Sequence, residues 1–270
     1  MFVFKIILFV ICLLFISFAQ IPDSILPMHA TNDEIVQHVT YTLNYAETYE
    51  QAKWVMYKLT KNHLQLNIAK RENNFREDPF VKTGSALPED YKSSGYDKGH
   101  LAPAANMIWS EVTMSESFYM SNISPQVPAF NRGIWKELEN YERQWANYFG
   151  EIWVVTGPIL KNGLPTIGRK NKISIPEAYF KIIFDENDYK MIGFVIPNKA
   201  EKQHLVTFVL SVDSIESLTN IKFFPFFSEK EKKDLKSTIK LEKWFEESSI
   251  ENELGLNEIL NIDVRNFKRK

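Results

Sequence analysis

The sequence has very little cysteine, almost no net charge and only one long apolar run. Its single cysteine, Cys12, lies inside that run, so the rest of the chain has no disulfide and must fold by packing alone. The formal net charge of −2 gives no overall attraction to polyanions, and any such contact must come from a local basic patch. The chain also has no internal repeat and no low-complexity tract. These absences exclude a disulfide-stapled protein, a strongly basic protein and a repeat protein.

The first 20 residues have the features of a secretory signal peptide. Lys5 is followed by an unbroken apolar run, and Ser17 and Ala19 place small residues at the −3 and −1 positions of a cleavage site. We therefore expect residues 1–19 to be removed and the protein to be secreted or periplasmic, with no stable membrane association afterwards. The alternative is an uncleaved anchor, because the run approaches the length of a spanning helix. No other segment of the sequence is apolar enough to span a bilayer.

The rest of the chain is long enough for one large core, since 44% of the 270 residues are hydrophobic. We predict one domain over residues 20–227 and a helical C-terminal extension over residues 228–270, where the composition turns to Lys, Glu and Ser. Strands are mixed with helices in the predicted order, which does not follow regular strand-helix repeats. The predicted strands are 38–45, 51–59, 152–158, 179–184 and 191–196, the helices 111–120 and 131–148, and the loops 71–97 and 124–128.

The helix predicted over 131–148 has a polar edge. Its apolar residues repeat at three- and four-residue spacing, and Gly150 follows the last of them. Asn131, Glu139 and Arg143 are separated by multiples of four, so they drift through an arc of roughly 120° and extend over roughly 18 Å. Three polar groups on one edge of a helix can line one cleft.

A second polar feature, Asp97-Lys98-Gly99-His100, precedes this helix. Of the five histidines, only His100 follows a glycine in what we expect to be a loop with polar neighbours. Imidazole suits the task of a general base because its unperturbed pKa lies near neutral. The amide of Asn131 offers a hard oxygen to Mg²⁺, and the carboxylate of Glu139 can hold the waters of such an ion. With a guanidinium to take up developing charge, these groups match metal-assisted cleavage of a phosphodiester.

Each of these residues also has an ordinary structural explanation. Asn131 at a predicted helix start is a typical N-cap, and Glu139 and Arg143 form an i,i+4 ion pair worth about 0.2–0.5 kcal/mol. Scattered cations are usually a solvated face. The joint occurrence of the motif and the helix residues in a fixed order favours the catalytic interpretation. The basic candidates for phosphate contact are Lys58, Lys61, Lys70, Arg71, Arg76, Lys98, Arg132 and Arg143.

Several further segments match the motifs of one family. They are Leu101-Ala102-Pro103-Ala104-Ala105-Asn106, Ser121-Asn122-Ile123-Ser124-Pro125-Gln126, Asn131-Arg132-Gly133-Ile134-Trp135, Leu138-Glu139, Val155-Thr156-Gly157-Pro158, Ile175-Pro176, Phe194-Val195-Ile196-Pro197-Asn198 and Phe223-Phe224-Pro225. With the motif before them, these segments resemble the DNA/RNA non-specific endonucleases of the ββα-metal (His-Me finger) group, and most closely the endonuclease G-like branch. The likeness runs from about residue 38 to residue 227.

The resemblance implies an α+β fold with a central antiparallel sheet, flanking helices and an inserted ββα finger that holds the metal. It implies that His100 is the general base and that Asn131 is the sole direct protein ligand of Mg²⁺, with Mn²⁺ or another divalent cation as the alternative. Glu139 would bind metal-bound water and Arg143 would stabilise transition-state charge. The implied partners are DNA and RNA, cut with little sequence preference to 5′-phosphate and 3′-hydroxyl ends, as expected if contacts go to backbone phosphates. A homodimer is the assembly to test.

The chain departs from the family motif at one position, because the family normally reads Asp-Arg-Gly-His and this chain has Lys98. Lysine keeps the positive charge but loses the planar fork that holds two phosphoryl oxygens, so we expect a catalytic role for Lys98 with reduced activity. A second family arginine precedes the motif, and both Arg71 and Arg76 qualify for it. We count these two and Arg132 as substrate-binding candidates.

The sequence therefore predicts a secreted, Mg²⁺-dependent, sugar-non-specific endonuclease. One alternative is a phosphodiesterase of the same scaffold that acts on another phosphate ester, since a metal centre does not recognise a base. A second alternative is a catalytically silent nucleic-acid-binding protein. The complete set of His100, Asn131, Glu139 and Arg143 counts against the silent protein, because a decayed site loses at least one such group.

Overall fold

The computed structural model of the chain describes residues 21–245. At its centre lies an antiparallel sheet of seven strands in the order β1-β2-β3-β6-β9-β10-β11. The strands are β1 (Glu34–Gln37), β2 (Tyr41–Ala46), β3 (Gln51–Thr60), β6 (Glu151–Pro158), β9 (Ala178–Asp185), β10 (Lys190–Pro197) and β11 (Val209–Leu210). The predicted signal peptide, residues 1–19, lies outside the described residues. Within residues 21–245, no helix has the length and apolar character needed to cross a membrane.

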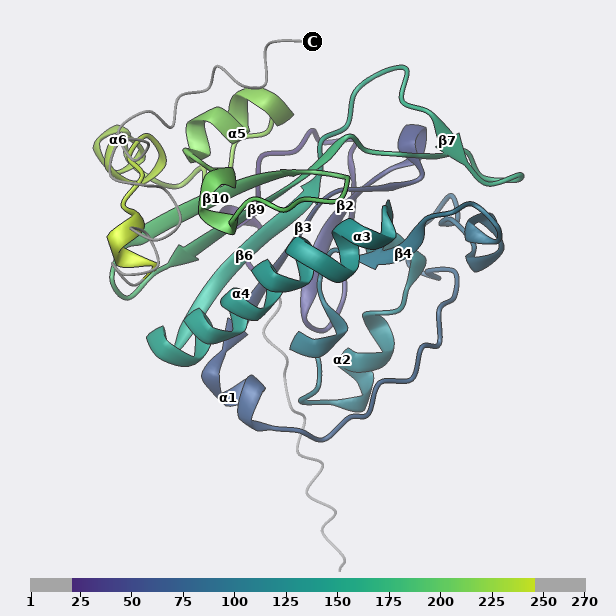
Figure 1. Cartoon of the computed structure of the whole chain (residues 1–270), viewed down its shortest axis with the longest axis horizontal. Coiled ribbons are helices and arrows are strands. Elements are labelled where there is room, and N and C mark those ends of the chain that lie inside the picture. Colours follow the sequence, from purple (N-terminus) through teal and green to yellow (C-terminus); the bar gives the residue numbers. More distant parts are fainter. Residues whose placement is uncertain (1–20, 246–270) are drawn as a thin grey trace, which may run out of the picture.

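Helices cover both faces of this sheet. The long helix α4 lies across one face, and α5 and α6 lie against the other (Figure 1). The helices are α1 (Lys61–Gln65), α2 (Glu111–Glu116), α3 (Pro128–Phe130), α4 (Lys136–Phe149), α5 (Val212–Thr219) and α6 (Glu229–Lys236). Short 3-10 turns occupy Asp23–Ile25, Glu47–Tyr49, Pro88–Tyr91, Ala104–Asn106, Met120–Asn122, Leu205–Phe208 and Leu241–Lys243. The fold is α+β, as predicted.

Side chains of β3 explain why both faces are covered. Val55 and Tyr57 join the core on the side of α4, whereas Trp54 and Met56 join the core on the side of α5 and α6. Successive side chains of a strand point to opposite faces, so a strand that is apolar at consecutive positions needs a partner layer on each side. The strands predicted over 38–45 and 51–59 correspond to β2 and β3, which pair in antiparallel register as a hairpin.

A second, two-stranded sheet pairs β4 (Asp97–His100) with β5 (Ile123–Gln126). From β5 the chain passes directly into α3, a π-helical turn at Asn131–Trp135, and α4. Strands β4 and β5 with this helix form the ββα unit that the resemblance implies, called the finger below. The sequence predicted loops for both strands, and that prediction is wrong. Neither segment has an apolar alternation. The two become strands only because they pair with each other, although α2 separates them along the sequence. A third small sheet pairs β7 (Thr166–Ile167) with β8 (Ile173–Ser174).

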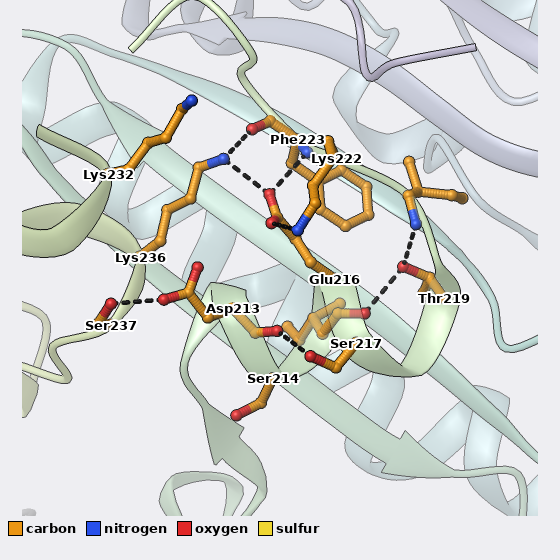
Figure 2. A network of polar contacts seen from close by, with 12 residues as sticks. Asp213, Ser214, Glu216, Ser217, Thr219, Lys222, Phe223, Lys232, Lys236 and Ser237 are labelled. Carbon is orange, nitrogen blue, oxygen red and sulfur yellow. Dashed lines mark hydrogen bonds and ion pairs between the residues drawn. The ribbon is translucent and has the colours of Figure 1, made fainter. Parts of the chain in front are cut away.

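The segment after residue 227 packs onto the same core. Trp145 of α4 donates its indole N–H to the carbonyl oxygen of Trp244 at 2.8 Å, and Leu235 of α6 is buried with the core on the α5 side. Figure 2 shows Lys236 of α6 donating to the Glu216 carboxylate at 2.7 Å and to the carbonyl oxygen of Phe223. The packing therefore continues through residue 245, past the domain boundary predicted at 227, while residues 246–270 of the predicted extension lie outside the described residues.

Candidate active site

Asp97, the first residue of the motif, ties β4 to the start of the long helix. Its Oδ2 accepts hydrogen bonds from Asn131 Nδ2 and from Arg132 Nε, both at 2.9 Å, and its Oδ1 accepts from Arg132 Nη2 at 2.6 Å. Partial burial raises the pKa of Asp97, but the bonds from Arg132 and Asn131 outweigh this and hold that pKa below its usual range. The carboxylate therefore stays ionised and brings the amide of Asn131 to the strand that ends in His100.

Asn131 is oriented by this contact. Because its Nδ2 donates to a carboxylate, the amide group is fixed with Oδ1 as its remaining acceptor. The chain is already helical at Pro128, and Asn131 has helical dihedrals of −57° and −45°, so it is not the N-cap that the sequence suggested. The π-helical turn that begins at Asn131 contains Gly133, whose φ of −102° and ψ of −115° depart from helical values. Such single π turns inside helices are frequent at functional sites.

His100 lies at the end of β4 in an aromatic enclosure. Its ring centroid is 5.5 Å from that of Phe75 and 5.0 Å from that of Phe118, and the residue is 8% exposed. Burial, assisted by the charge of Arg71, lowers the pKa of His100 to about 3. Its Nε2 is buried and has no hydrogen-bond partner among residues 21–245. The imidazole is therefore neutral near pH 7, and the same burial makes it a weaker base than the ordinary histidine that the sequence suggests.

The structure decides which of the two candidate arginines, Arg71 or Arg76, lies near His100. Arg71 lies over the ring of Phe118 at 5.1 Å, and its charge acts on both His100 and Glu139. Arg76 instead stacks over Tyr119 at 4.0 Å and donates to the carbonyl oxygen of Ser115 at 2.9 Å, which fastens the segment before the motif to α2. Arg71 is thus the one of the two that lies at the site.

The other predicted cations lie around the same finger. Lys98 places its ammonium 4.9 Å from the centre of the Phe75 ring, which also packs on His100. The side chain of Arg132 is 72% exposed and pairs with Asp97 at the entrance to the helix. Both cations remain close to the strand that carries His100.

Gly99 is required by a close approach within the finger. A Cβ atom at this position would lie 2.2 Å from the side-chain amide of Gln126, which is fully buried. The side chain of Gln126 thus occupies the space that any residue larger than glycine would need. The glycine of the motif therefore has a packing role.

Glu139 and Arg143 do not rely on each other as the predicted surface ion pair. Arg143 donates from Nη1 to Asn106 Oδ1 at 2.9 Å and from Nη2 to Asn140 Oδ1 at 2.5 Å. Burial raises the pKa of Glu139 to about 7, against the opposing charges of Lys181, Arg143 and Arg71. The carboxyl group of Glu139 therefore titrates near neutral pH when no cation is bound.

This raised pKa makes stability depend on pH in a defined direction. Between the ordinary value of 4.5 and about 7, the folded chain binds the Glu139 proton more tightly than the unfolded chain does. Its contribution to stability is therefore fully present below the unfolded pKa and is lost as the pH rises through the folded one. We expect Glu139→Gln to gain stability relative to the wild type as the pH rises, by at most about 3 kcal/mol.

Urea unfolding in the presence of a chelator, at several pH values from about 4.5 to about 8, measures this difference. Glu111→Gln, an exposed glutamate at the start of α2, is the matched control. A difference between Glu139→Gln and wild type that stays constant with pH would contradict the raised pKa.

Two site groups were missed by sequence reasoning. Glu142 lies at a core position of α4 and is fully buried, and Lys181 lies fully buried in β9. Both interrupt apolar patterns, since Glu142 falls in the stripe with Leu138 and Trp145. Charged residues at core positions are rarely buried unless they are paired, and that signal was present in the sequence. Their pairing with each other was not readable from it.

The donor set suits a weakly ligated hard cation. Among residues 21–245 there is no group of three or more His, Cys, Asp or Glu side chains that could hold a metal ion. What the finger offers is the oriented amide oxygen of Asn131, with the carboxyl of Glu139 two helical turns further along. Mg²⁺ keeps several of its waters and needs only one or two protein oxygens, so these residues fit it.

The structure links the predicted site residues through short connections. Asn131 contacts Asp97, which lies three residues before His100 on β4, a distance of about 10 Å along a strand. The charge of Arg71 adds to the lowering that burial causes in the pKa of His100 and opposes the rise that burial causes in the pKa of Glu139. Arg143 lies one turn beyond Glu139 on α4. Together the fold and the site define a hydrolase class that carries a neutral histidine, an amide oxygen and cations on the strands and helix of one ββα unit.

Comparisons with known proteins agree with this class. The profile of the DNA/RNA non-specific endonuclease family matches residues 27–229. The chain is 33% identical over 201 residues to "Endonuclease G, mitochondrial" of Homo sapiens, a match that covers 69% of this chain and 68% of that protein. It is 31% identical over 215 residues to "Nuclease C1" of Cunninghamella echinulata var. echinulata, covering 72% of this chain and 84% of that protein.

A solved structure is similar over most of the fold. The crystal structure of an EndoG/EndoGI complex, which concerns the mechanism of EndoG inhibition, matches with a TM-score of 0.68 and 28% identity. The match covers 74% of this chain and 89% of that chain. The protein therefore belongs to the DNA/RNA non-specific endonuclease family, on its endonuclease G-like branch, and is a hydrolase of nucleic acids. The predicted family and fold are confirmed, and the roles of individual residues stay predictions.

Proposed function

We propose that the protein is a divalent-metal-dependent, sugar-non-specific endonuclease that hydrolyses DNA and RNA to 5′-phosphate and 3′-hydroxyl ends. The observation that carries the proposal is the set of hydrogen bonds that Asp97 accepts from Asn131 and Arg132, called the Asp97 clamp here. It brings the amide oxygen of Asn131 to the strand that carries a neutral, buried His100. A neutral imidazole and a hard amide oxygen on one short strand-helix junction are the two groups that metal-assisted hydrolysis needs first.

Each side chain then has a task in the proposed reaction. His100 accepts a proton from the attacking water, whose oxygen forms the new bond to phosphorus as the bond to the 3′-oxygen breaks. The leaving 3′-oxygen takes a proton from solvent water and becomes the 3′-hydroxyl. Arg143 donates hydrogen bonds to the phosphoryl oxygens as charge develops on them. Asn131 would hold Mg²⁺ directly and Glu139 would hold it through water. A bound divalent cation supplies Lewis-acid stabilisation of the leaving oxygen.

The distribution of cations supports low sequence selectivity. Arg71 and Arg132 are exposed beside the finger, and Lys98 lies on the strand of the motif. Guanidinium and ammonium groups bind phosphates, which every sequence and both sugars share. Lys98 provides one charge without a fork, so we expect weaker transition-state stabilisation than an arginine would give at that position.

Plasmid nicking tests the proposal. Purified protein with Mg²⁺ should nick and then degrade supercoiled DNA, should cleave RNA at a comparable rate, and should stop when a chelator is added. End labelling should find 5′-phosphates on the products. Binding without cleavage across a series of divalent metals would support the silent protein, whereas turnover of small diesters alone would support another phosphodiesterase.

Export is a further part of the proposal, and it rests on the amino-terminal pattern of one lysine, an apolar run and two small residues. Cleavage after Ala19 would leave Gln20 as the new amino terminus. Amino-terminal sequencing of the protein recovered outside the cytoplasm tests this, and an intact Met1 in that fraction would favour the uncleaved anchor.

A further inference from the structure

A buried path of hydrogen bonds, formed by Lys181, Glu142 and Asn106, runs from the central sheet to the site. The ammonium of Lys181 on β9 donates to Glu142 Oε2 at 2.6 Å. The other oxygen of that carboxylate, Oε1, accepts from the hydroxyl of Tyr57 at 2.6 Å and from Asn106 Nδ2 at 2.5 Å. All four residues are fully buried, and they come from four separate parts of the chain.

This path ends on Arg143, which has a role in the proposed mechanism. Asn106 accepts at Oδ1 from Arg143 Nη1 at 2.9 Å. A carboxylate only accepts hydrogen bonds, so Glu142 fixes which way the Asn106 amide faces. The amide must turn its N–H groups to Glu142 and its oxygen to Arg143. Arg143 therefore meets an acceptor, the oxygen of Asn106, and not the N–H groups of that amide.

We propose that Lys181 and Glu142 act through Asn106 as positioning residues that hold the Arg143 guanidinium on the reacting phosphate. The inference rests on the proposed function, because it presumes that Arg143 contacts the phosphate. Glu142 and Arg143 are adjacent on α4 but have different partners. Glu142 faces the sheet, where it accepts from Lys181. Arg143 is held at the site by Asn106, the last residue of the turn after the motif. Arg143 also donates to Asn140, so two of its nitrogens are anchored in place.

Burial of this pair needs a reason other than stability. Taking two charges out of water is costly, and replacing a buried ion pair with apolar residues is often neutral or stabilising. Here the pair completes a hydrogen-bonded path whose last member is a cation next to Glu139. A guanidinium fixed before the reaction stabilises developing charge without reorganising, which is the benefit the path supplies.

The first variant breaks the path at its middle. Asn106→Leu keeps a side chain of similar size but removes the acceptor of Arg143. We expect kcat on DNA to fall by about 10- to 100-fold, the scale of a misplaced catalytic group. KM should stay within about threefold, because the lost interaction belongs to the transition state. A thermal melt shows whether the variant is folded.

The second test reverses the polarity of the path and then restores it. Glu142→Gln should lower kcat, because the new amide N–H group faces either the Lys181 ammonium or Asn106. Adding Lys181→Met removes the buried cation, so the introduced glutamine can turn its N–H away and again offer its oxygen to Asn106. We expect the double variant to recover kcat to within about threefold of wild type, a coupling that a double-mutant cycle isolates.

The chain offers a matched control in a second buried lysine-glutamate pair. Glu216 accepts from Lys236 at 2.7 Å, and both residues are buried between α5 and α6 (Figure 2). Glu216→Gln, alone and with Lys236→Met, makes the same chemical change away from the finger. We expect these variants to lose thermal stability while keeping wild-type kcat, so a general loss of stability is separated from mispositioning of Arg143.

The variant Arg143→Ala distinguishes failure of this inference from failure of the proposed function. Loss of activity in Arg143→Ala together with wild-type kcat in folded Asn106→Leu would overturn the inference and leave the proposed mechanism standing. Wild-type kcat in Arg143→Ala would overturn both the role of Arg143 and the inference. A double variant no more active than Glu142→Gln would also count against the path.

Discussion

Replacement of His100 by alanine is expected to lower kcat by at least about a thousandfold, towards the upper end of the range for loss of a general base. The imidazole is neutral near pH 7 because burial and the charge of Arg71 lower its pKa to about 3. Alanine cannot accept a proton, and no other histidine of the described chain contacts Phe75 and Phe118 in its place. Initial rates of plasmid nicking at saturating Mg²⁺ measure the effect.

The fold and nucleic-acid binding should survive this change. Removing the ring also removes a buried Nε2 that has no partner among residues 21–245, which offsets part of the cost of the cavity. His63→Ala is the matched control, because His63 also packs on an aromatic ring, that of Trp109 at 4.3 Å, but lies on α1. Equal turnover by His100→Ala and wild type would refute the role of the base.

The second large effect is expected for Asn131→Ala. This change removes the amide oxygen that we assign to the metal, and it should reduce kcat by about 10²–10³-fold at ordinary Mg²⁺ concentrations. Raising Mg²⁺ should recover part of the activity, with the concentration for half-maximal rate at least about tenfold above that of wild type. A titration of cleavage rate against Mg²⁺ separates weakened metal binding from damage to the base.

The clamp itself supplies the control for this variant. Arg132→Ala removes the other partner of Asp97 but leaves the Asn131 amide bonded to that carboxylate. Its Mg²⁺ dependence should match that of wild type, while its affinity for nucleic acid should fall modestly and more at low salt. If Arg132→Ala shifted the Mg²⁺ titration as far as Asn131→Ala does, the assignment of the amide as metal ligand would have to be withdrawn.

Much of the site was predictable because its residue types and spacing are local properties. The motif of Asp97 and His100, the amide of Asn131, and the helical spacing of Glu139 and Arg143 can all be read along the chain. The same holds for strands β2 and β3, which the sequence shows as runs rich in apolar and aromatic residues. These features depend on neighbours within a few residues, so a sequence carries them without a structure.

Other parts could not be predicted because they depend on which distant segments meet. Strands β4 and β5 lack an apolar alternation and are strands only through mutual pairing. The choice between Arg71 and Arg76 depends on where α2 packs, since Ser115 and Tyr119 hold Arg76 away from the site. The helix begins at Pro128 because the chain from β5 turns directly into it.

The sequence alone determined the family, the residue types of the candidate site and their order along the chain. Tertiary structure decided their chemistry: burial lowers the pKa of His100 and raises that of Glu139. It also decided that Arg143 is held by Asn106, and through it by a carboxylate and an ammonium that the sequence shows only as charges in apolar patterns. The reason is physical, because desolvation and hydrogen-bond polarity are set by surroundings that come together only when the chain folds.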